Sequence, residues 1–139
     1  MRTRLDVNAL LDPDHASHLT AKDWRLQHRE QGWASCPLTQ NGCVRIISQQ
    51  GYPNPQTVST VVELVATPCA DPCHESWPDD ASLLDARRFH HAHIHGHRQI
   101  TDLYLLGLVV GHNGRLVSFD EKIPLSAVHG AKKQHLLML

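Results

Sequence analysis

Three aspartates, Asp6, Asp102 and Asp120, stand where predicted strands end or a predicted helix begins. Asp6 and Asp120 each lie at the carboxyl end of a short apolar strand, and ligand sites in open α/β sheets lie beyond such ends. Asp102 begins an apolar helix, whose dipole favours an ionised carboxylate at that terminus. We therefore expect the three carboxylates to converge at one edge of a sheet.

Carboxylates packed this closely repel one another, so a cluster of them is stable with a hard cation between its members. Ligation by oxygen alone suits Mg²⁺ or Mn²⁺. A cation held in this way activates water and offsets charge on a phosphate under attack. The aspartates therefore predict metal-dependent hydrolysis of a phosphodiester. Each one taken alone also fits an ordinary structural role, as a turn cap at Asp6, a helix-dipole partner at Asp102 or a turn residue at Asp120.

The elements that must position these acids follow from the spacing of apolar residues. Strands are expected over residues 3–7, 33–38, 115–119 and 135–139. Helices are expected over residues 16–31, about 39–47, 58–66, 81–88 and 102–110. Helices thus alternate with short strands along the chain, which is typical of a parallel sheet covered by helices on both faces. The predicted fold class is α/β.

Individual positions sharpen these expectations. Leu19 and Trp24 are expected to face inward from the helix over residues 16–31. Val62 is expected on the core face of the helix over residues 58–66. Thr101 is the expected N-cap of the apolar helix that carries Asp102.

Length and composition describe an ordinary globular chain. It has 139 residues, within the usual size of one domain, and 41% of them are apolar. The net charge of −1 argues against binding nucleic acid by bulk charge alone, but not against an enzyme that meets phosphate through a metal ion. No apolar run approaches the roughly 18 residues of a membrane span, and the N-terminal residues lack an apolar signal region. We expect a cytoplasmic protein with a single domain over residues 1–139 and no membrane partner.

Two groups of side chains suggest other metals. The cysteines are expected to be reduced thiols, although the spacing of Cys69, Cys73 and His74 is also compatible with zinc. The histidine-rich stretch over residues 89–97 has i, i+4 spacings that would suit a transition metal on a helix. Gly96 favours instead an exposed loop, which would bind phosphate when its histidines are charged. A histidine-based metal-binding or hydrolase domain is therefore an alternative interpretation.

Five stretches of the chain, taken in order, resemble the PIN-domain toxins of the VapC type, from bacterial type II toxin–antitoxin systems. They are LDVNALL at residues 5–11, GWASCPLTQNG at 32–42, WPDD at 77–80, HRQITDLYLL at 97–106 and GRLVSFD at 114–120. Each stretch is weak alone, but the ordered set is specific, and the resemblance extends from residue 5 to about residue 123.

The resemblance implies a PIN-like three-layer α/β/α sandwich around a central, mainly parallel sheet. It implies a Mg²⁺- or Mn²⁺-dependent endoribonuclease that cleaves structured RNA such as tRNA or rRNA. It also implies a cognate antitoxin protein that blocks the site, and a toxin homodimer. Asp6, Asp102 and Asp120 match the first, third and fourth acids of the family motif, as the metal-holding and catalytic residues.

The second acid of the motif is usually a glutamate, and here the chain departs from the pattern. The context of Thr39 puts Gln40 at that place, with Asn41 as the next candidate. An amide oxygen can still accept a hydrogen bond from a water molecule, or ligate weakly. The substitution removes one negative charge, so we expect weaker metal affinity. The alternative is a catalytically weakened module that binds RNA or a partner on the same fold.

Several polar residues are expected beside the acids, as hydrogen-bonding support or as RNA contacts. They are Asn8, Thr39, Asn41, Arg98, Thr101 and Ser118. Arg98 is the strongest candidate for an RNA contact, because it lies four residues before Asp102. Asp79 and Asp80 also belong to a stretch of the resemblance, but a cap of the turn after Pro78 is the simpler interpretation.

Overall fold

The computed structural model of the chain describes residues 3–4, 18–53, 55–118 and 123–139. The described residues form helices and short strands that pair in parallel, which confirms the α/β class. They group into two compact units, one of residues 5–79 and one of residues 1–4 with residues 80–139. The single domain expected over residues 1–139 stays a prediction.

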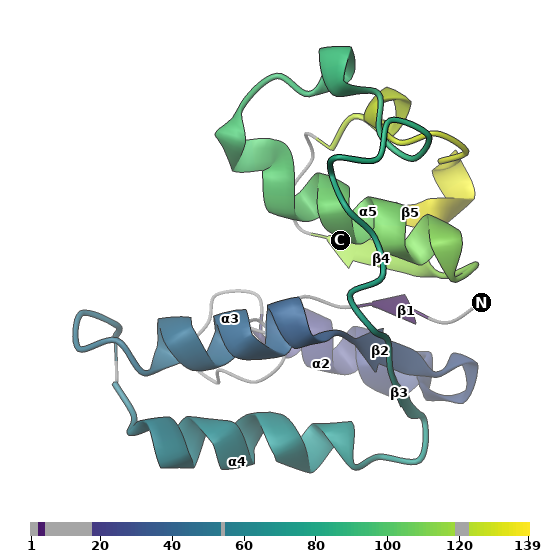
Figure 1. The fold of residues 1–139 in the computed structure, drawn as a ribbon. Coiled ribbons are helices and arrows are strands. Elements are labelled where there is room, and N and C mark those ends of the chain that lie inside the picture. The colour runs from purple at the N-terminus through teal and green to yellow at the C-terminus, as the bar shows by residue number, and fades with distance from the viewer. Residues whose placement is uncertain (1–2, 5–17, 54, 119–122) are drawn as a thin grey trace. The chain divides into compact units, whose positions relative to one another are not determined.

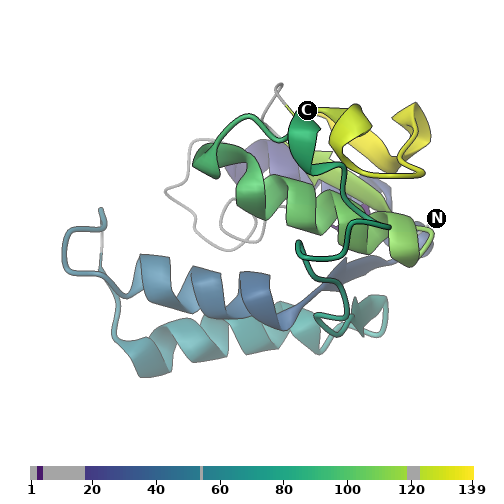
Figure 2. The same ribbon diagram turned by 45° about the horizontal axis from the view of Figure 1, so that its top comes forward.

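The unit of residues 5–79 contains a short parallel strand pair and a helical hairpin. Its described elements are α2 (His18–Gln27), the 3-10 turn η1 (Arg29–Gln31), β2 (Trp33–Ser35), α3 (Pro37–Ile47), α4 (Val58–Cys69) and β3 (His74–Ser76). β2 and β3 pair with Trp33 opposite His74. α3 and α4 lie side by side in both views (Figure 1 and Figure 2). Their contact buries Cys43, Ile47, Val61 and Val65.

α3 begins two residues earlier than the sequence predicts, because three groups satisfy its amino end. Pro37 occupies the first helical position, where its fixed φ suits a helix and its missing N–H is not needed. The hydroxyl of Thr39 donates to the Cys36 carbonyl at 3.0 Å. The carboxylate of Asp79 accepts the backbone N–H of Leu38 at 2.9 Å. The amino end of α3 is therefore fixed from within and from a distant segment.

The unit that contains residues 80–139 is built on a second parallel sheet segment. Its strands are β1 (Thr3–Arg4), β4 (Arg115–Ser118) and β5 (Leu136–Met138), with β4 between the other two. The apolar helix α5 (Ile100–Gly111) packs against β4 and is buried over most of its length. The predicted strands near residues 115–119 and 135–139 are thus confirmed in type and place. Of the predicted strand over residues 3–7, the part beyond Arg4 lies outside the described residues.

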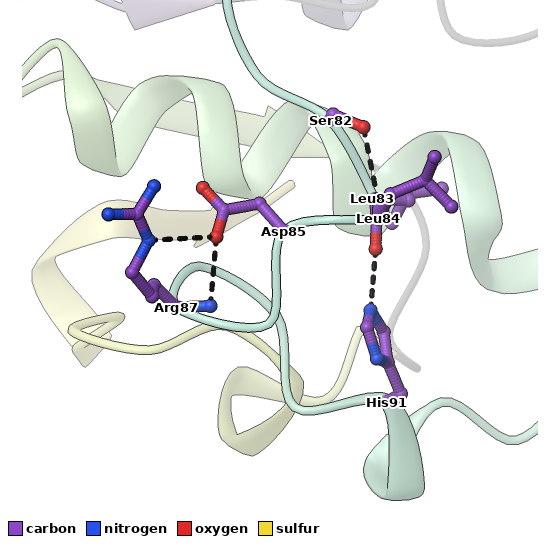
Figure 3. Close-up of polar contacts among 6 residues, drawn as sticks. All are labelled: Ser82, Leu83, Leu84, Asp85, Arg87 and His91. Atoms are coloured by element: carbon purple, nitrogen blue, oxygen red, sulfur yellow. Dashed lines mark hydrogen bonds and ion pairs between the residues drawn. The ribbon is translucent and has the colours of Figure 1, made fainter.

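The helix expected over residues 81–88 is not formed, and this prediction was wrong. The Ser82 hydroxyl accepts the backbone N–H of Leu84 at 3.1 Å, and the Asp85 carboxylate accepts the N–H of Arg87 at 2.9 Å (Figure 3). Side chains that capture nearby backbone N–H groups stabilise turns in place of a helix. His91 fixes the loop further through its Nε2 atom, which donates to the Leu83 carbonyl.

The inward faces of two helices differ from the sequence prediction. Trp24 is buried as expected, but Leu19 is 73% exposed, and nothing in the described structure explains its exposure. Val62 is 48% exposed, because Val61 and Val65 form the face of α4 that packs on α3 and Val62 is turned away from it. Among the described residues, no helix combines the length and the apolar character that crossing a membrane requires.

Candidate active site

Of the three predicted catalytic acids, Asp102 is among the residues that the structure describes. It lies in the first turn of α5. It is half-buried and is the third residue of the helix. The helix begins at Ile100 with Gln99 as its N-cap, so Thr101 is an exposed residue of the first turn and its expected capping role was wrong. Asp6, Asn8 and Asp120 lie outside the described residues.

The connection between α5 and β4 places Asp102 at the carboxyl end of β4. Residues 112–114 join the two elements, which pack together and run in opposite directions (Figure 1). A rise of about 1.5 Å per residue puts Asp102 about 14 Å from Gly111 along α5. Steps of about 3.3 Å put Ser118 about 10 Å from the start of β4. Asp102 and the buried Ser118 therefore lie at the same end of this unit.

The amino end of α5 also has the electrostatic character expected of an anion-handling site. Backbone N–H groups of a first helical turn carry partial positive charge, and Asp102 lies in this turn. Arg98 is exposed in η3 (His97–Gln99), directly before α5. Gln99 fixes the segment that leads into α5, because its Oε1 atom accepts the backbone N–H of His95 at 2.9 Å. The RNA-contact role of Arg98 stays a prediction.

Gln40 occupies the first turn of α3, and its side chain is held by a buried hydroxyl. Its Nε2 atom donates to the Ser35 Oγ atom at 2.8 Å. Ser35 ends β2 with 0% of its surface exposed, and its Oγ atom lies 2.7 Å from the Nε2 atom of His74 on β3. Three elements of this unit thus meet through the side chains of Gln40, Ser35 and His74.

The neighbours of Gln40 differ in what they do. Thr39 caps α3 through the Cys36 backbone, which gives its hydroxyl a structural task beside any support of the site. Asn41 is exposed on the same helix. The support of the site by Thr39 and Asn41 stays a prediction.

Asp79 and Asp80 have separate structural roles. Asp79 is a cap, as expected, but it caps the amino end of α3 and not the turn after Pro78. Asp80 lies 3.4 Å from the imidazole of His112. Sequence analysis gave Ser35 no role and considered His74 only as a possible zinc ligand. The signal that could have identified Ser35 was a polar residue in the otherwise apolar strand Trp33–Ser35.

His74 is fixed by its surroundings on β3. Its ring tilts at 60° against the Trp33 ring, with 4.4 Å between centroids, and its backbone N–H donates to the Asp71 carbonyl. The backbone N–H of Cys73 and the guanidinium groups of Arg29 and Arg25 hold the pKa of Asp71 below its ordinary value. The charged turn at Asp71 therefore anchors the start of the strand that carries His74.

The alternative metal sites find no support in the described residues. The histidine-rich stretch forms the 3-10 turns η2 (His91–His93) and η3 instead of a continuous helix, so i, i+4 pairs do not share a face. Across residues 3–4, 18–53, 55–118 and 123–139, no three histidine, cysteine or acidic side chains are placed to hold a metal ion. No disulfide joins the cysteines, all of which the structure describes. The reduced state of the thiols stays a prediction.

Two histidine rings of this stretch instead lie close to each other and to the ring of His129. The ring centroids of His90 and His93 lie 3.8 Å apart, and those of His90 and His129 lie 5.7 Å apart. Burial, together with the neighbouring rings of His93 and His129, lowers the pKa of His90. These rings join the segment around residue 90 to the segment around residue 129.

The chain is similar along its length to proteins from Mycobacterium tuberculosis. It is 48% identical over 142 aligned residues to Ribonuclease VapC44, with 100% of both chains covered. It is 34% identical over 134 residues to Ribonuclease VapC39, and the alignment covers 94% of this chain and 96% of the relative. It is 35% identical over 133 residues to Ribonuclease VapC29, and the alignment covers 94% of this chain and 92% of the relative. No protein-family model matches the chain.

Identity at this level over nearly the whole of both chains shows common family membership. The chain belongs to the VapC family. The family predicted from the five ordered sequence stretches is thereby confirmed.

Proposed function

We propose that the chain is a Mg²⁺- or Mn²⁺-dependent endoribonuclease, the toxin of a type II toxin–antitoxin system. The observation that carries the proposal is the position of Asp102, at the end of its unit where β4 finishes. The names of the relatives describe them as ribonucleases, which supports RNA as the substrate. Structured RNA, tRNA or rRNA, is the substrate class that we infer.

The parallel pairing of β1 and β4 supports the proposed set of acids. Thr3 pairs with Arg115 and Arg4 with Leu116, so both strands leave the sheet at the same edge. Asp6 follows the last described residue of β1 by two positions, and Asp120 follows Ser118 by two positions. We infer from these sequence positions that Asp6 and Asp120 join Asp102 in one metal site.

The donor chemistry of these residues fits a hard divalent cation. Asp102 supplies carboxylate oxygens at a half-buried position, and Asp6 and Asp120 are the same residue type. The described residues alone do not complete a metal site, so the proposal requires all three aspartates. A cation held by them would activate water and offset charge on the scissile phosphodiester. Gln40 would orient that water, and Arg98 would contact an RNA phosphate.

The remaining family expectations belong to the same proposal. We infer a PIN-like three-layer sandwich formed by one domain, a homodimer and a cognate antitoxin that blocks the site. The cytoplasm is the compartment in which such an enzyme would meet tRNA or rRNA. Family membership supports each of these inferences.

Cleavage of RNA by the purified, antitoxin-free chain tests the proposal. Total tRNA and rRNA are incubated with the protein in Mg²⁺, in Mn²⁺ and in EDTA, and fragments are resolved on a gel. We expect cutting in either ion, loss of cutting in EDTA and recovery when the ion is added back. Cutting that persists in EDTA would contradict the metal-dependent mechanism.

A catalytically weakened binding module is the second candidate, and the amide of Gln40 is the observation that favours it. An amide lacks the negative charge of the glutamate that the family motif has at this place. On this account the folded protein binds the RNA without cutting it in any ion. Gln40→Glu would then restore cleavage, which separates this candidate from an inactive or misfolded preparation.

A further inference from the structure

The buried hydroxyl of Ser35 has two strong hydrogen-bonding neighbours and a single proton. Its Oγ atom lies 2.8 Å from the Nε2 atom of Gln40 and 2.7 Å from the Nε2 atom of His74. Cys69 is a third neighbour, with its Sγ atom at 3.7 Å. Because a buried polar group is stable only when its hydrogen-bonding capacity is satisfied, the direction of each bond is coupled to the others.

The proton order of this network follows from the donors and acceptors available. The Gln40 Nε2 atom can only donate, so the Ser35 oxygen accepts from it. The hydroxyl proton then goes to His74 Nε2, which is a stronger and nearer acceptor than the Cys69 sulfur. His74 Nε2 therefore carries no hydrogen in its neutral form, and the ring proton resides on Nδ1.

This order determines which atom Gln40 presents outside the network. With Nε2 bound to Ser35, the Oε1 atom points away from the hydroxyl, and no hydrogen bond within the described residues engages it. The reverse order would run from a His74 Nε2–H through Ser35 to Gln40 Oε1, and the amide NH₂ would then face outward. An oxygen facing outward can accept a hydrogen bond, as a glutamate carboxylate does, whereas an NH₂ group cannot.

We propose that Ser35 and His74 are positioning residues that hold the Gln40 amide with its Oε1 atom directed away from their hydrogen-bond network. Gln40 thereby presents an acceptor oxygen at the place where the family motif has a glutamate. The role of this oxygen in RNA cleavage rests on the proposed function. The hydrogen-bond order is a property of the folded chain and does not depend on it.

The structure around His74 is built to fix the imidazole in one orientation. The Trp33 ring packs against the imidazole, with 4.4 Å between the ring centroids. The guanidinium of Arg25 in turn lies over the Trp33 ring, with its Cζ atom 5.8 Å from the ring centroid. The Asp71 carbonyl accepts the backbone N–H of His74 at 2.9 Å. These contacts hold the ring, so that its Nε2 atom stays within reach of Ser35.

Imidazole ¹⁵N chemical shifts of the full chain at pH 8 test the proton order directly, because they distinguish the two neutral tautomers. Two other histidines supply internal references. The His28 Nδ1 atom lies 2.8 Å from the Trp24 carbonyl and must carry its proton there, whereas His91 must carry its proton on Nε2 to bond the Leu83 carbonyl. We expect the His74 signal to match His28. A His74 signal that matches His91 would overturn the proton order on which the proposal rests.

Gln40→Glu provides a second test on the same spectrum. A carboxylate can only accept, so the Ser35 hydroxyl must turn toward it and His74 must then donate from Nε2. We expect His74 to gain an Nε2 proton in this variant, while His28 and His91 keep their signals. A His74 signal unchanged by Gln40→Glu would show that the three side chains are not coupled, which contradicts the proposal.

Kinetics of RNA cleavage separate positioning from a merely structural role. We expect Ser35→Ala and His74→Leu to lower kcat on the order of 10-fold, with KM for the same RNA within about two-fold, as for residues that orient a group in a site. His74→Gln, whose amide oxygen can accept the hydroxyl proton, should recover most of that loss. Variants that lose thermal stability but keep the wild-type kcat would overturn the positioning role. If the wild-type chain cleaves no RNA, the proposed function fails, and the NMR results still decide the hydrogen-bond order.

Discussion

The ring of Phe89 lies against the backbone of Gly107 in the middle of α5. A Cβ atom built on Gly107 would stand 2.5 Å from the Phe89 Cζ atom and 2.8 Å from its Cε1 atom. Phe89 is 1% exposed, so its ring has little room to move aside. The absence of a side chain at residue 107 therefore allows Phe89, the first residue of the histidine-rich stretch, to pack on the helix that carries Asp102.

Gly107→Ala is predicted to destabilise the protein in spite of the better helix propensity of alanine. The propensity gain is about 1 kcal/mol, whereas overpacking a buried contact costs about 1–3 kcal/mol. Because a contact of 2.5 Å with a buried ring puts the cost at the upper end of this range, we expect a net loss of about 2 kcal/mol in the free energy of unfolding, measured in urea. Combining it with Phe89→Leu should show positive coupling in a double-mutant cycle, because the smaller side chain relieves the clash. Strictly additive effects would contradict the contact.

Asp71→Asn tests the charged turn that leads into β3. The Asp71 carboxylate accepts the Cys73 N–H at 2.9 Å and lies 3.4 Å from Arg25 and 3.5 Å from Arg29. An asparagine can keep the bond to Cys73 but loses both ion pairs, so we expect a loss of about 1 kcal/mol in urea unfolding at pH 7.

The same carboxylate makes a predictable contribution to the pH dependence of stability. Contacts that lower the pKa of Asp71 below its ordinary 3.8 stabilise the folded state above that pH, and this stabilisation is lost as the pH falls through the lower folded value. The stability difference between the wild type and Asp71→Asn should therefore shrink under strongly acidic conditions. A difference that is constant from neutral to acidic pH would contradict the electrostatic origin.

His90 should make the protein less stable below neutral pH. Its pKa is lowered in the folded state by burial and by its histidine neighbours, so the unfolded chain binds the proton more readily. Stability should fall as the pH drops through the ordinary histidine value of 6.5. We expect a lower melting temperature at pH 5.5 than at pH 7.5, and a smaller difference in His90→Gln. His97→Gln, at an exposed position, is the matched control, and an equal reduction in both variants would argue against an effect of the rings around His90.

Arg98→Gln tests the proposed phosphate contact before α5. Loss of one phosphate contact should weaken RNA binding for every sequence and reduce the slope of log K against log salt by about 1. Binding is measured in EDTA by fluorescence anisotropy over a range of salt concentrations. Arg87→Gln is the control, because its side chain is 93% exposed and pairs with Asp85 at 3.3 Å. Equal salt slopes for the wild type and Arg98→Gln would remove Arg98 from the RNA interface.

Much of the architecture near Asp102 was predictable because its signals are local. The nearly continuous apolar run after Asp102 indicates a buried helix, and the turn that follows it returns the chain as a strand. Residues 81–88 misled the prediction, because Ser82 and Asp85 bind backbone N–H groups and favour turns over a helix. Local hydrogen bonds from side chains to the backbone outweigh helix propensity in this segment.

The Gln40 network shows what the sequence could not disclose. Gln40 and Ser35 are close along the chain, but His74 reaches them only through the parallel pairing of β2 with β3. Asp79 likewise meets the amino end of α3 from 41 residues away. Contacts of this kind depend on strand register, which short strands encode weakly. The family motif identified Gln40 as unusual, and the fold shows what holds it.

The most direct test of the account compares RNA cleavage by the wild type, Asp102→Asn and Asp23→Asn in the same Mn²⁺ buffer. Asn keeps the shape of the side chain and removes the charge, and Asp23 is an exposed residue of α2 that serves as the matched control. We expect Asp102→Asn to reduce kcat by on the order of 100-fold, about 2.7 kcal/mol in the barrier, while Asp23→Asn cuts like the wild type. RNA binding and thermal melting should stay close to wild type in both variants. Cleavage by folded Asp102→Asn at the wild-type rate would contradict the proposed site.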